Sequence, residues 1–311
     1  YEIATATTTE SGKNQDAVFV MYAGSLVKIF EDIIGPAFQK ESGFSYIGEG
    51  KGSVQVSNLI KDGFRTPDVF VSAGTVPMMR LMNSPPPPPL VDWLIKFGSA
   101  EIVIAYTSNS PYFGELEKAR KGEIPWYDVI SQKDFNFGRT DPELDPKGYY
   151  GIIVTKLANI YYNDSSIKDK ILGEDRNPKQ IYPEEILKTV LETGHLDAII
   201  AYKHEAISRG LLYIALPDEI NLSDPAYSDL YKRANYTLES DKKIIYGEPV
   251  EFSITIPKTV KNMEGAISFV NFVMSENGSQ LLESQGLDPI DMVFEGNIGN
   301  IPLSIREIVL P

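Results

Sequence analysis

Met21-Tyr22-Ala23-Gly24-Ser25-Leu26 is the stretch that decides the fold, because a strand runs into a helix there through a Gly-Ser pair. Residues 17–21 form a continuous apolar run rich in strand-forming residues, as in a strand buried on both faces of a parallel sheet. Apolar residues then recur at helical spacing, so Ser25 is expected at the N-cap. Backbone N–H groups and a helix dipole would meet there, which favours an anion.

The same junction occurs a second time. Ordinary capping would explain one Gly-Ser pair, but residues 44–47 again read as a strand, and residues 48–53 end in Gly-Ser before a short amphipathic helix. The carboxyl ends of strands in an open α/β sheet share one edge, where ligands bind. We therefore expect Ser25 and Ser53 to converge on one small anion. The order of glycines and lysine in residues 48–53 differs from a phosphate-binding loop, which argues against a nucleotide.

Composition narrows the function classes. The chain has 311 residues, which suits two domains, and a formal charge of −14, which argues against nucleic acid or an anionic membrane surface as partner. Cysteine is absent, so disulfides, thiolate metal sites and cysteine nucleophiles are excluded. The two histidines, His195 and His204, are too few and too isolated for a zinc site or a Ser-His-Asp triad. We expect neither enzyme activity nor a cofactor.

The order of predicted elements indicates an α/β protein with two lobes, each a mixed sheet flanked by helices. Residues 1–16 read as a disordered polar tether left after a signal segment was removed. Lobe 1 is expected to comprise residues 17–101 and 250–311, with a returning strand at 250–257 and helices after it. Lobe 2 is expected to comprise residues 102–249, so that two connections form a hinge. The prolines at 85–89 are expected to form an exposed polyproline spacer.

Two carboxylates are candidates for the cleft. Asp145 precedes Pro146, the arrangement of an N-cap followed by proline at the first helical position, so capping is an alternative to ligand binding. Glu184 lies on the helical stripe of Leu187 and Leu191, whereas Glu185 lies on the polar face with Lys188. Glu184 is therefore the carboxylate expected to point inward.

Carboxylates beside an oxyanion pose an electrostatic conflict. A carboxylate about 4 Å from a dianion costs roughly 8 kcal/mol at an effective dielectric constant near 20. A helix N-terminus stabilises an anion by only about 0.3 to 2 kcal/mol. Two carboxylates can thus lie beside an oxyanion only if they are protonated or bonded to its central atom. Sulfate and phosphate cannot add ligands, whereas molybdenum(VI) and tungsten(VI) can.

Several short motifs occur together in a specific order and spacing. They are Ala23-Gly24-Ser25-Leu26, Gly52-Ser53, Asp145-Pro146-Lys147-Gly148-Tyr149, Tyr161-Tyr162-Asn163-Asp164 and Ala201-Tyr202-Lys203. With them, about residues 18 to 290 resemble the archaeal type of molybdate/tungstate-binding proteins of ABC importers. The resemblance implies a class II periplasmic-binding-protein fold on the extracellular face of the membrane. It also implies an oxyanion held between the lobes and delivered to a membrane permease by a monomeric, non-catalytic protein.

The resemblance also carries over site residues. Gly24, Ser25 and Ser53 match positions that donate hydrogen bonds to the oxo groups. Asp145 and Glu184 match the two carboxylate ligands that make the metal six-coordinate. The match at the second carboxylate could slip by one residue to Glu185, although the helical-face argument prefers Glu184.

Other assignments stay open at this point. Tyr202 is either a ligand neighbour or a core tyrosine with a satisfied hydroxyl, and Lys147 is expected to face solvent. Another oxyanion such as sulfate or phosphate is an alternative ligand, as is ferric iron bound by tyrosine pairs at 149–150 or 161–162. A carboxylate-pair glycosidase is the alternative from another class, although the chain has only two tryptophans to line a sugar cleft. The sequence does not rank tungstate against molybdate.

Overall fold

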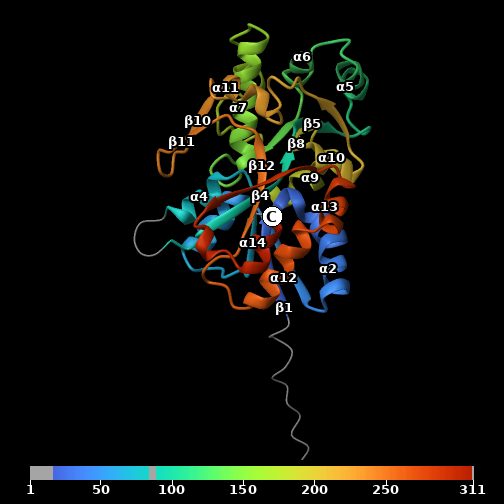
Figure 1. Ribbon diagram of the computed structural model, residues 1–311. Coiled ribbons are helices and arrows are strands. Elements are labelled where there is room, and N and C mark those ends of the chain that lie inside the picture. The colour runs from blue at the N-terminus through green and yellow to red at the C-terminus, as the bar shows by residue number, and fades with distance from the viewer. Residues whose placement is uncertain (1–16, 84–88, 310–311) are drawn as a thin grey trace, which may run out of the picture.

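The protein forms two α/β lobes, one above the other, each built on its own mixed sheet (Figure 1). The computed structural model describes residues 17–83 and 89–309. The tether expected at residues 1–16 and most of the proline run at 85–89 lie outside the described residues. No described helix is long and apolar enough to cross a membrane.

The first lobe, lower in Figure 1, holds a six-stranded sheet of strand order β13-β4-β12-β3-β1-β2. Its strands are β1 (Ala17–Ala23), β2 (Ser45–Lys51), β3 (Val69–Ala73), β4 (Trp93–Ala100), β12 (Val250–Thr255) and β13 (Asp288–Gly296). Its helical segments are η1 (Gly24–Leu26), α1 (Val27–Ile29), the π-helical η2 (Phe30–Ile34), α2 (Gly35–Ser42), α3 (Ser53–Lys61), α4 (Val76–Met82), α12 (Met263–Met274), α13 (Glu276–Glu283), η4 (Ile298–Asn300) and α14 (Leu303–Val309).

The second lobe holds a five-stranded sheet of strand order β7-β6-β8-β5-β9, and a separate hairpin of β10 and β11. Its strands are β5 (Ile102–Tyr106), β6 (Phe137–Thr140), β7 (Ile181–Tyr182), β8 (Ala198–Tyr202), β9 (Leu212–Ala215), β10 (Asn235–Thr237) and β11 (Ile244–Tyr246). Its helices are α5 (Phe113–Arg120), α6 (Trp126–Ile130), α7 (Pro146–Tyr161), α8 (Ile167–Leu172), α9 (Glu184–Glu192), α10 (Lys203–Arg209), η3 (Pro225–Tyr227) and α11 (Ser228–Tyr231).

Strand direction places the loops that meet between the lobes. β1 pairs in parallel with β2 and β3, and every residue of β3 is buried, as expected of a strand covered on both faces. In the second lobe β6 pairs in parallel with β8, whereas β5 pairs antiparallel with β8 and β9. The carboxyl ends of β1, β6 and β8 lead directly into η1, the α7 region and α10. These ends supply most of the candidate site.

The chain crosses between the two sheets twice. The first crossing joins β4 to β5 through Glu101, and the second enters β12 at Val250. The two crossings are held together through the same loop, because the N–H of Ile102 donates to the carbonyl of Asn221 at 2.9 Å and that of Val250 to the carbonyl of Leu222 at 2.8 Å. β12 also pairs with β4.

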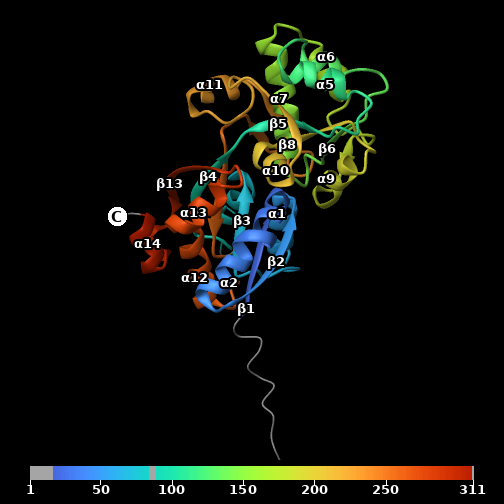
Figure 2. The ribbon, with the colours of Figure 1, turned by 90° about the vertical axis from the view of Figure 1, so that its right-hand side faces the viewer.

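The expectation of a two-lobed α/β fold with two mixed sheets is confirmed. The expectation that only helices follow the strand at 250–257 is wrong, because β13 pairs antiparallel with β4 at the sheet edge. Its residues are mostly exposed or half-buried, and its pairing with β4 shifts register between Pro289 and Val293, so the pattern of a regular half-buried strand is interrupted. Figure 2 shows β13 and β4 on the first lobe.

Candidate functional site between the lobes

Two glycines of the first lobe touch the carboxylate-bearing segments of the second. A β-carbon on Gly24 would lie 2.4 Å from Cγ of Glu184. A β-carbon on Gly52 would lie 2.4 Å from the carbonyl oxygen of Leu144 and 3.1 Å from Cβ of Asp145. The backbone N–H of Gln55 also donates to the carbonyl of Leu144 at 3.0 Å. The structure thus brings both Gly-Ser junctions against both predicted carboxylates, where α1 faces α9 and α10 in Figure 2.

The first serine is buried but does not cap a helix. The N-cap of η1 is Ala23, so the N-cap position expected for Ser25 is wrong. A 3₁₀ turn precedes α1 and moves the helix start past the serine. Ser25 is 6% exposed, and its Oγ has no hydrogen-bond partner among the described residues. A buried hydroxyl without a partner is costly, so this oxygen is available to a ligand.

Ser53 differs from Ser25. It is the first residue of α3, with Gly52 at the N-cap, and it is fully buried. Its Oγ accepts a hydrogen bond from the N–H of Ala73 at 3.1 Å. The hydroxyl proton is not used in that bond, so the group can still donate to an anion.

Asp145 stands at the N-cap of α7, but its side chain forms no capping hydrogen bond with the helix. The capping alternative for its carboxylate is therefore wrong. Instead Oδ2 accepts a bond from Thr140 Oγ1 at 2.7 Å, and the residue is 4% exposed. Burial, and then the charge of Glu184, raise the pKa of Asp145 to about 7. Near neutral pH this carboxyl therefore changes charge readily.

Glu184 is buried and Glu185 is not. Glu184 opens α9 and is 4% exposed, whereas Glu185 is exposed and pairs with Lys51 of the first lobe at 3.3 Å. The inward direction predicted for Glu184 from the helical stripe is confirmed. The same argument placed Lys188 on the polar face, and this is wrong, since Lys188 is 2% exposed.

Two lysines and two glutamates form a buried cluster beside the cleft. Lys147 Nζ donates to Glu184 Oε1 at 3.1 Å and to Glu205 Oε1 and Oε2 at 2.9 and 2.8 Å. Lys188 Nζ donates to the carbonyl oxygen of Glu184 at 3.1 Å, to its Oε1 at 2.5 Å and to Glu205 Oε1 at 3.0 Å. Lys147 is fully buried, so the expectation that it faces solvent is wrong.

Charge pairing favours the ionised forms of Glu205 and Lys147. Burial alone would raise the pKa of Glu205, but Lys147 and Lys188 outweigh it and hold the pKa well below its usual range. Burial alone would lower the pKa of Lys147, but the charges of Glu184 and Glu205 outweigh burial and raise this pKa above its ordinary value. Sequence reasoning missed Lys188 and Glu205. The available signals were the spacing of four between Glu184 and Lys188 and the capping-box spacing of three between Tyr202 and Glu205.

Further buried hydroxyls at the site lack partners. Those of Tyr149 and Tyr202 are buried and have no hydrogen-bond partner among the described residues. Of the two readings for Tyr202, the one with a satisfied hydroxyl is therefore wrong. Burial, and then the charge of Asp145, raise the pKa of Tyr202 well above its usual range, so this side chain is a donor. The ring of Tyr202 also lies 5.4 Å from Lys147 Nζ.

The tyrosine pair at 161–162 lies at the far end of α7. The helix starts at Pro146, so at about 1.5 Å per residue this pair is more than about 20 Å along the axis from Asp145. Tyr162 accepts a bond from Trp126 Nε1 at 3.2 Å. Tyr162 thus packs against α6, Tyr161 is exposed, and neither tyrosine reaches the cleft.

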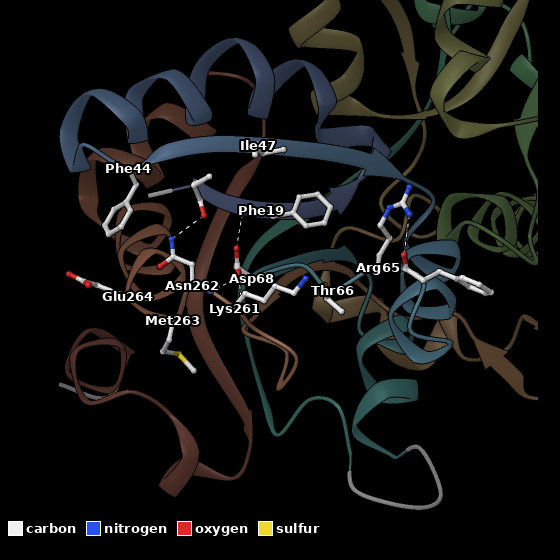
Figure 3. Close-up of a pocket in the computed structure, with 12 residues that line it drawn as sticks. Phe19, Phe44, Ile47, Arg65, Thr66, Asp68, Lys261, Asn262, Met263 and Glu264 are labelled. Carbon is white, nitrogen blue, oxygen red and sulfur yellow. Dashed lines mark hydrogen bonds between the residues drawn. The ribbon is translucent and has the colours of Figure 1, made fainter. Parts of the chain in front are cut away.

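A hollow of about 250 Å³ leads to the two carboxylates. It is lined by Gly52, Asp145, Tyr182, Glu184 and neighbouring residues of both lobes. A larger hollow of about 770 Å³ lies at the opposite end of β1 from Gly24. Figure 3 shows its lining, where Asp68 Oδ2 accepts a bond from the N–H of Phe19 at 2.9 Å. None of the predicted site residues lines the larger hollow, so size does not identify the site.

Sequence comparison decides the family. The family described as bacterial extracellular solute-binding protein matches residues 18–288. The chain belongs to this family. This solute-binding protein is 33% identical to a solute-binding protein of Petrotoga mobilis over 94% of this chain and 89% of that protein. It is 31% identical to the molybdate/tungstate-binding protein WtpA of Pyrococcus abyssi over 97% of this chain and 92% of that protein.

Solved structures agree on the fold of this solute-binding protein. The periplasmic molybdate-binding protein of Azotobacter vinelandii matches with a TM-score of 0.58 at 14% identity, over 87% of this chain and 98% of that one. The sulfate-binding protein SubI of Mycobacterium tuberculosis matches with a TM-score of 0.58 at 15% identity, over 94% and 89%. At such identities the likeness extends to the fold alone. The chain therefore shares the two-lobed fold of these two binding proteins.

Proposed function

We propose that this protein captures molybdate or tungstate between its lobes and delivers it to the permease of an ABC importer. The main support for this proposal is that two buried carboxylates, those of Asp145 and Glu184, converge with buried hydroxyls. Neither carboxylate caps a helix, and the hydroxyls have no partner in the described structure. The relatives named molybdate/tungstate-binding protein WtpA, in Pyrococcus abyssi and Thermococcus kodakarensis, support the same ligand.

Each candidate has a role in this proposal. The hydroxyls of Ser25, Ser53 and Tyr202 and the backbone at Gly24 donate hydrogen bonds to the oxo groups. Asp145 and Glu184 coordinate the metal directly. The oxyanion thus bridges the lobes, with the serines on one side and the carboxylates on the other. Contacts to both lobes favour the closed arrangement.

The charges at the site support an anion whose central atom accepts more ligands. A dianion beside Glu184 meets a buried carboxylate whose lysine partners are already engaged by protein oxygens. Formation of a bond between the carboxylate oxygen and the metal replaces that repulsion. Asp145, with its pKa raised to about 7, loses its proton at little cost when it becomes a ligand. Sulfate offers no such bond.

We further propose an oligomeric state and a location for the protein. The protein acts as a monomer on the extracellular side of the membrane, and residues 1–16 serve as its tether. Family membership supports a binding role in place of catalysis.

X-ray absorption at the tungsten edge of the tungstate-bound protein tests the coordination. We expect two more oxygen neighbours than free tungstate has, and one fewer in Asp145→Asn than in the wild type. A spectrum unchanged from free tungstate would show an oxyanion bound by hydrogen bonds alone, with no bond to either carboxylate.

A further inference from the structure

Glu205 uses its whole carboxylate within the protein. Oε1 accepts bonds from Lys147 Nζ at 2.9 Å and Lys188 Nζ at 3.0 Å. Oε2 accepts bonds from Lys147 Nζ at 2.8 Å and from the N–H of Tyr202 at 2.8 Å. The side chain is 1% exposed. Glu205 is therefore saturated by its neighbours and is not itself a ligand for an anion.

The ammonium groups of both lysines are saturated in turn. An ammonium has three protons to donate. Lys147 makes three hydrogen bonds and Lys188 makes three, and all six end on oxygens of Glu184 or Glu205. The two buried ammonium groups of the cluster thus have no proton left for an oxyanion. Two lysines against two glutamates also leave the cluster without net charge.

The same bonds orient Glu184. Both lysines donate to its Oε1, at 3.1 and 2.5 Å. Its Oε2 lies 2.9 Å from Lys147 Nζ as an ion pair, but at an angle that makes no hydrogen bond. One oxygen of Glu184 accepts hydrogen bonds from both lysines, and the other accepts no hydrogen bond among the described residues although Lys147 lies beside it. A carboxylate held in this way presents a single oxygen to a metal centre.

We infer that Glu205 is a specificity-determining positioning residue of the oxyanion site, which keeps both lysines engaged so that the site does not attract dianions by charge alone. The inference rests on the proposed function and extends it. With the lysines engaged, an oxyanion that cannot add ligands meets two carboxylates and no free ammonium group. An oxyanion that can add ligands gains bonds to Asp145 and Glu184. Discrimination against sulfate therefore comes partly from Glu205, because it keeps the lysine protons from bonding to the anion.

Calorimetric titration with sulfate and with tungstate, at one fixed salt concentration, tests this on Glu205→Gln. The amide keeps an acceptor for the Tyr202 N–H and leaves two lysines against one glutamate. We expect sulfate binding to appear and the tungstate-to-sulfate affinity ratio to fall at least about tenfold, since a bond to a charged group is gained. A structural role alone would weaken both ligands and would not create sulfate binding.

Two further variants complete the experiment. Lys188→Met combined with Glu205→Gln restores the charge balance, so it is expected to abolish sulfate binding again. Glu192→Gln removes the same charge from the exposed end of α9 and is expected to leave the ratio as in the wild type. A ratio in Glu205→Gln within about threefold of the wild type, in a variant that melts cooperatively, would overturn the inference.

The remaining outcomes separate the inference from the proposed function. If Glu205→Gln does not fold, Glu205→Asp decides, because the shorter carboxylate draws back from the two lysines, and sulfate binding is expected to appear. Sulfate still silent in a folded Glu205→Asp, with tungstate bound as in the wild type, would overturn the inference. Failure of the wild type to bind either metal oxyanion would refute the proposed function. Sulfate binding gained by Glu205→Gln would even then show that Glu205 withholds the lysines.

Discussion

His204 is a neutral imidazole held in the packed region beside the cleft. Its ring stacks on Tyr202 with centroids 5.5 Å apart and meets the edge of Phe252 at 5.3 Å. Neither ring nitrogen forms a hydrogen bond of good geometry within the described residues, although the backbone of Ser25 lies close by. Burial lowers the pKa of His204 to about 4. The folded protein therefore binds a proton at this ring less readily than the unfolded chain does.

This shift predicts acid sensitivity. The folded pKa is below the ordinary value of 6.5, so stability is full above about 6.5 and is lost as pH falls toward about 4. His204 alone should remove about 3 kcal/mol of unfolding free energy over that range. We expect His204→Phe to keep the ring packing and to lack this part of the loss. Urea unfolding at pH 7 and at pH 4.5 measures the difference.

The control for this prediction is His195, the other histidine, which is exposed. His195→Phe should retain the acid sensitivity of the wild type. Equal losses of stability on acidification in the wild type and in His204→Phe would show that the imidazole is not kept neutral by burial.

At the scale of elements, the ends of η1 and α3 approach the second lobe because glycine precedes each serine. Gly52 has φ −52° and ψ 130°, a conformation open to any residue, so its backbone does not require glycine. What requires it is the carbonyl of Leu144, which would lie 2.4 Å from an added β-carbon. The glycine allows the lobes to close and the serine supplies the hydroxyl.

Gly52→Ala is therefore expected to hinder closure without removing any ligand group. Overpacking of a tight contact costs about 1 to 3 kcal/mol, so we expect tungstate affinity to fall about 5- to 150-fold. The thermal midpoint of the ligand-free protein should stay near that of the wild type. Calorimetry and thermal melting together measure the two effects.

Gly114→Ala is the matched control, because a β-carbon at Gly114 on α5 meets no heavy atom within 4 Å. It should bind tungstate as the wild type does. Wild-type affinity in Gly52→Ala would mean that the close approach of Gly52 to Leu144 does not accompany binding.

The elements themselves were largely predictable from local patterns. The apolar run at 17–21 gives β1 to within two residues, and the returning strand expected at 250–257 gives β12 to within two residues. β13 was missed because Pro289 stands near its start and its apolar residues do not alternate regularly, as its shifted register with β4 reflects. The start of α1 was misplaced because a 3₁₀ turn, which shares the same spacing signals, precedes it.

The candidate site was predictable where one helix or one strand decides it. The stripe of α9 was enough to separate Glu184 from Glu185. The burial of Lys147 could not be predicted in this way, because its partners Glu184 and Glu205 lie 37 and 58 residues along the chain. Contacts between separate helices of a lobe decide which charged side chains face inward. The spacing of residues along one helix does not reveal these contacts.

At the scale of the whole molecule, the two crossings between the sheets make closure the natural response to a ligand. The lobes meet at Gly24 and Gly52, and the ion pair between Lys51 and Glu185 spans the same gap at 3.3 Å. A closed arrangement buries the hydroxyls of Ser25 and Tyr202, which favours a ligand that bonds them. We expect the ligand-free protein to populate a more open arrangement.

Small-angle X-ray scattering measures this directly. Saturating tungstate should decrease the radius of gyration of the wild type. The same tungstate concentration should decrease it less in Gly52→Ala. Identical scattering with and without bound tungstate would show that the lobes do not move on binding.

The measurement that tests the central claim most directly is calorimetric titration with tungstate, molybdate and sulfate of the wild type, Asp145→Asn and Glu184→Gln, with Glu192→Gln at the exposed end of α9 as the surface control. We predict tight binding of both metal oxyanions and none of sulfate by the wild type. Each buried carboxylate variant should lose at least about a hundredfold in affinity, about 2.7 kcal/mol, while Glu192→Gln stays close to the wild type. Sulfate bound as tightly as tungstate, or affinity indifferent to both buried carboxylates, would contradict coordination of the metal by Asp145 and Glu184.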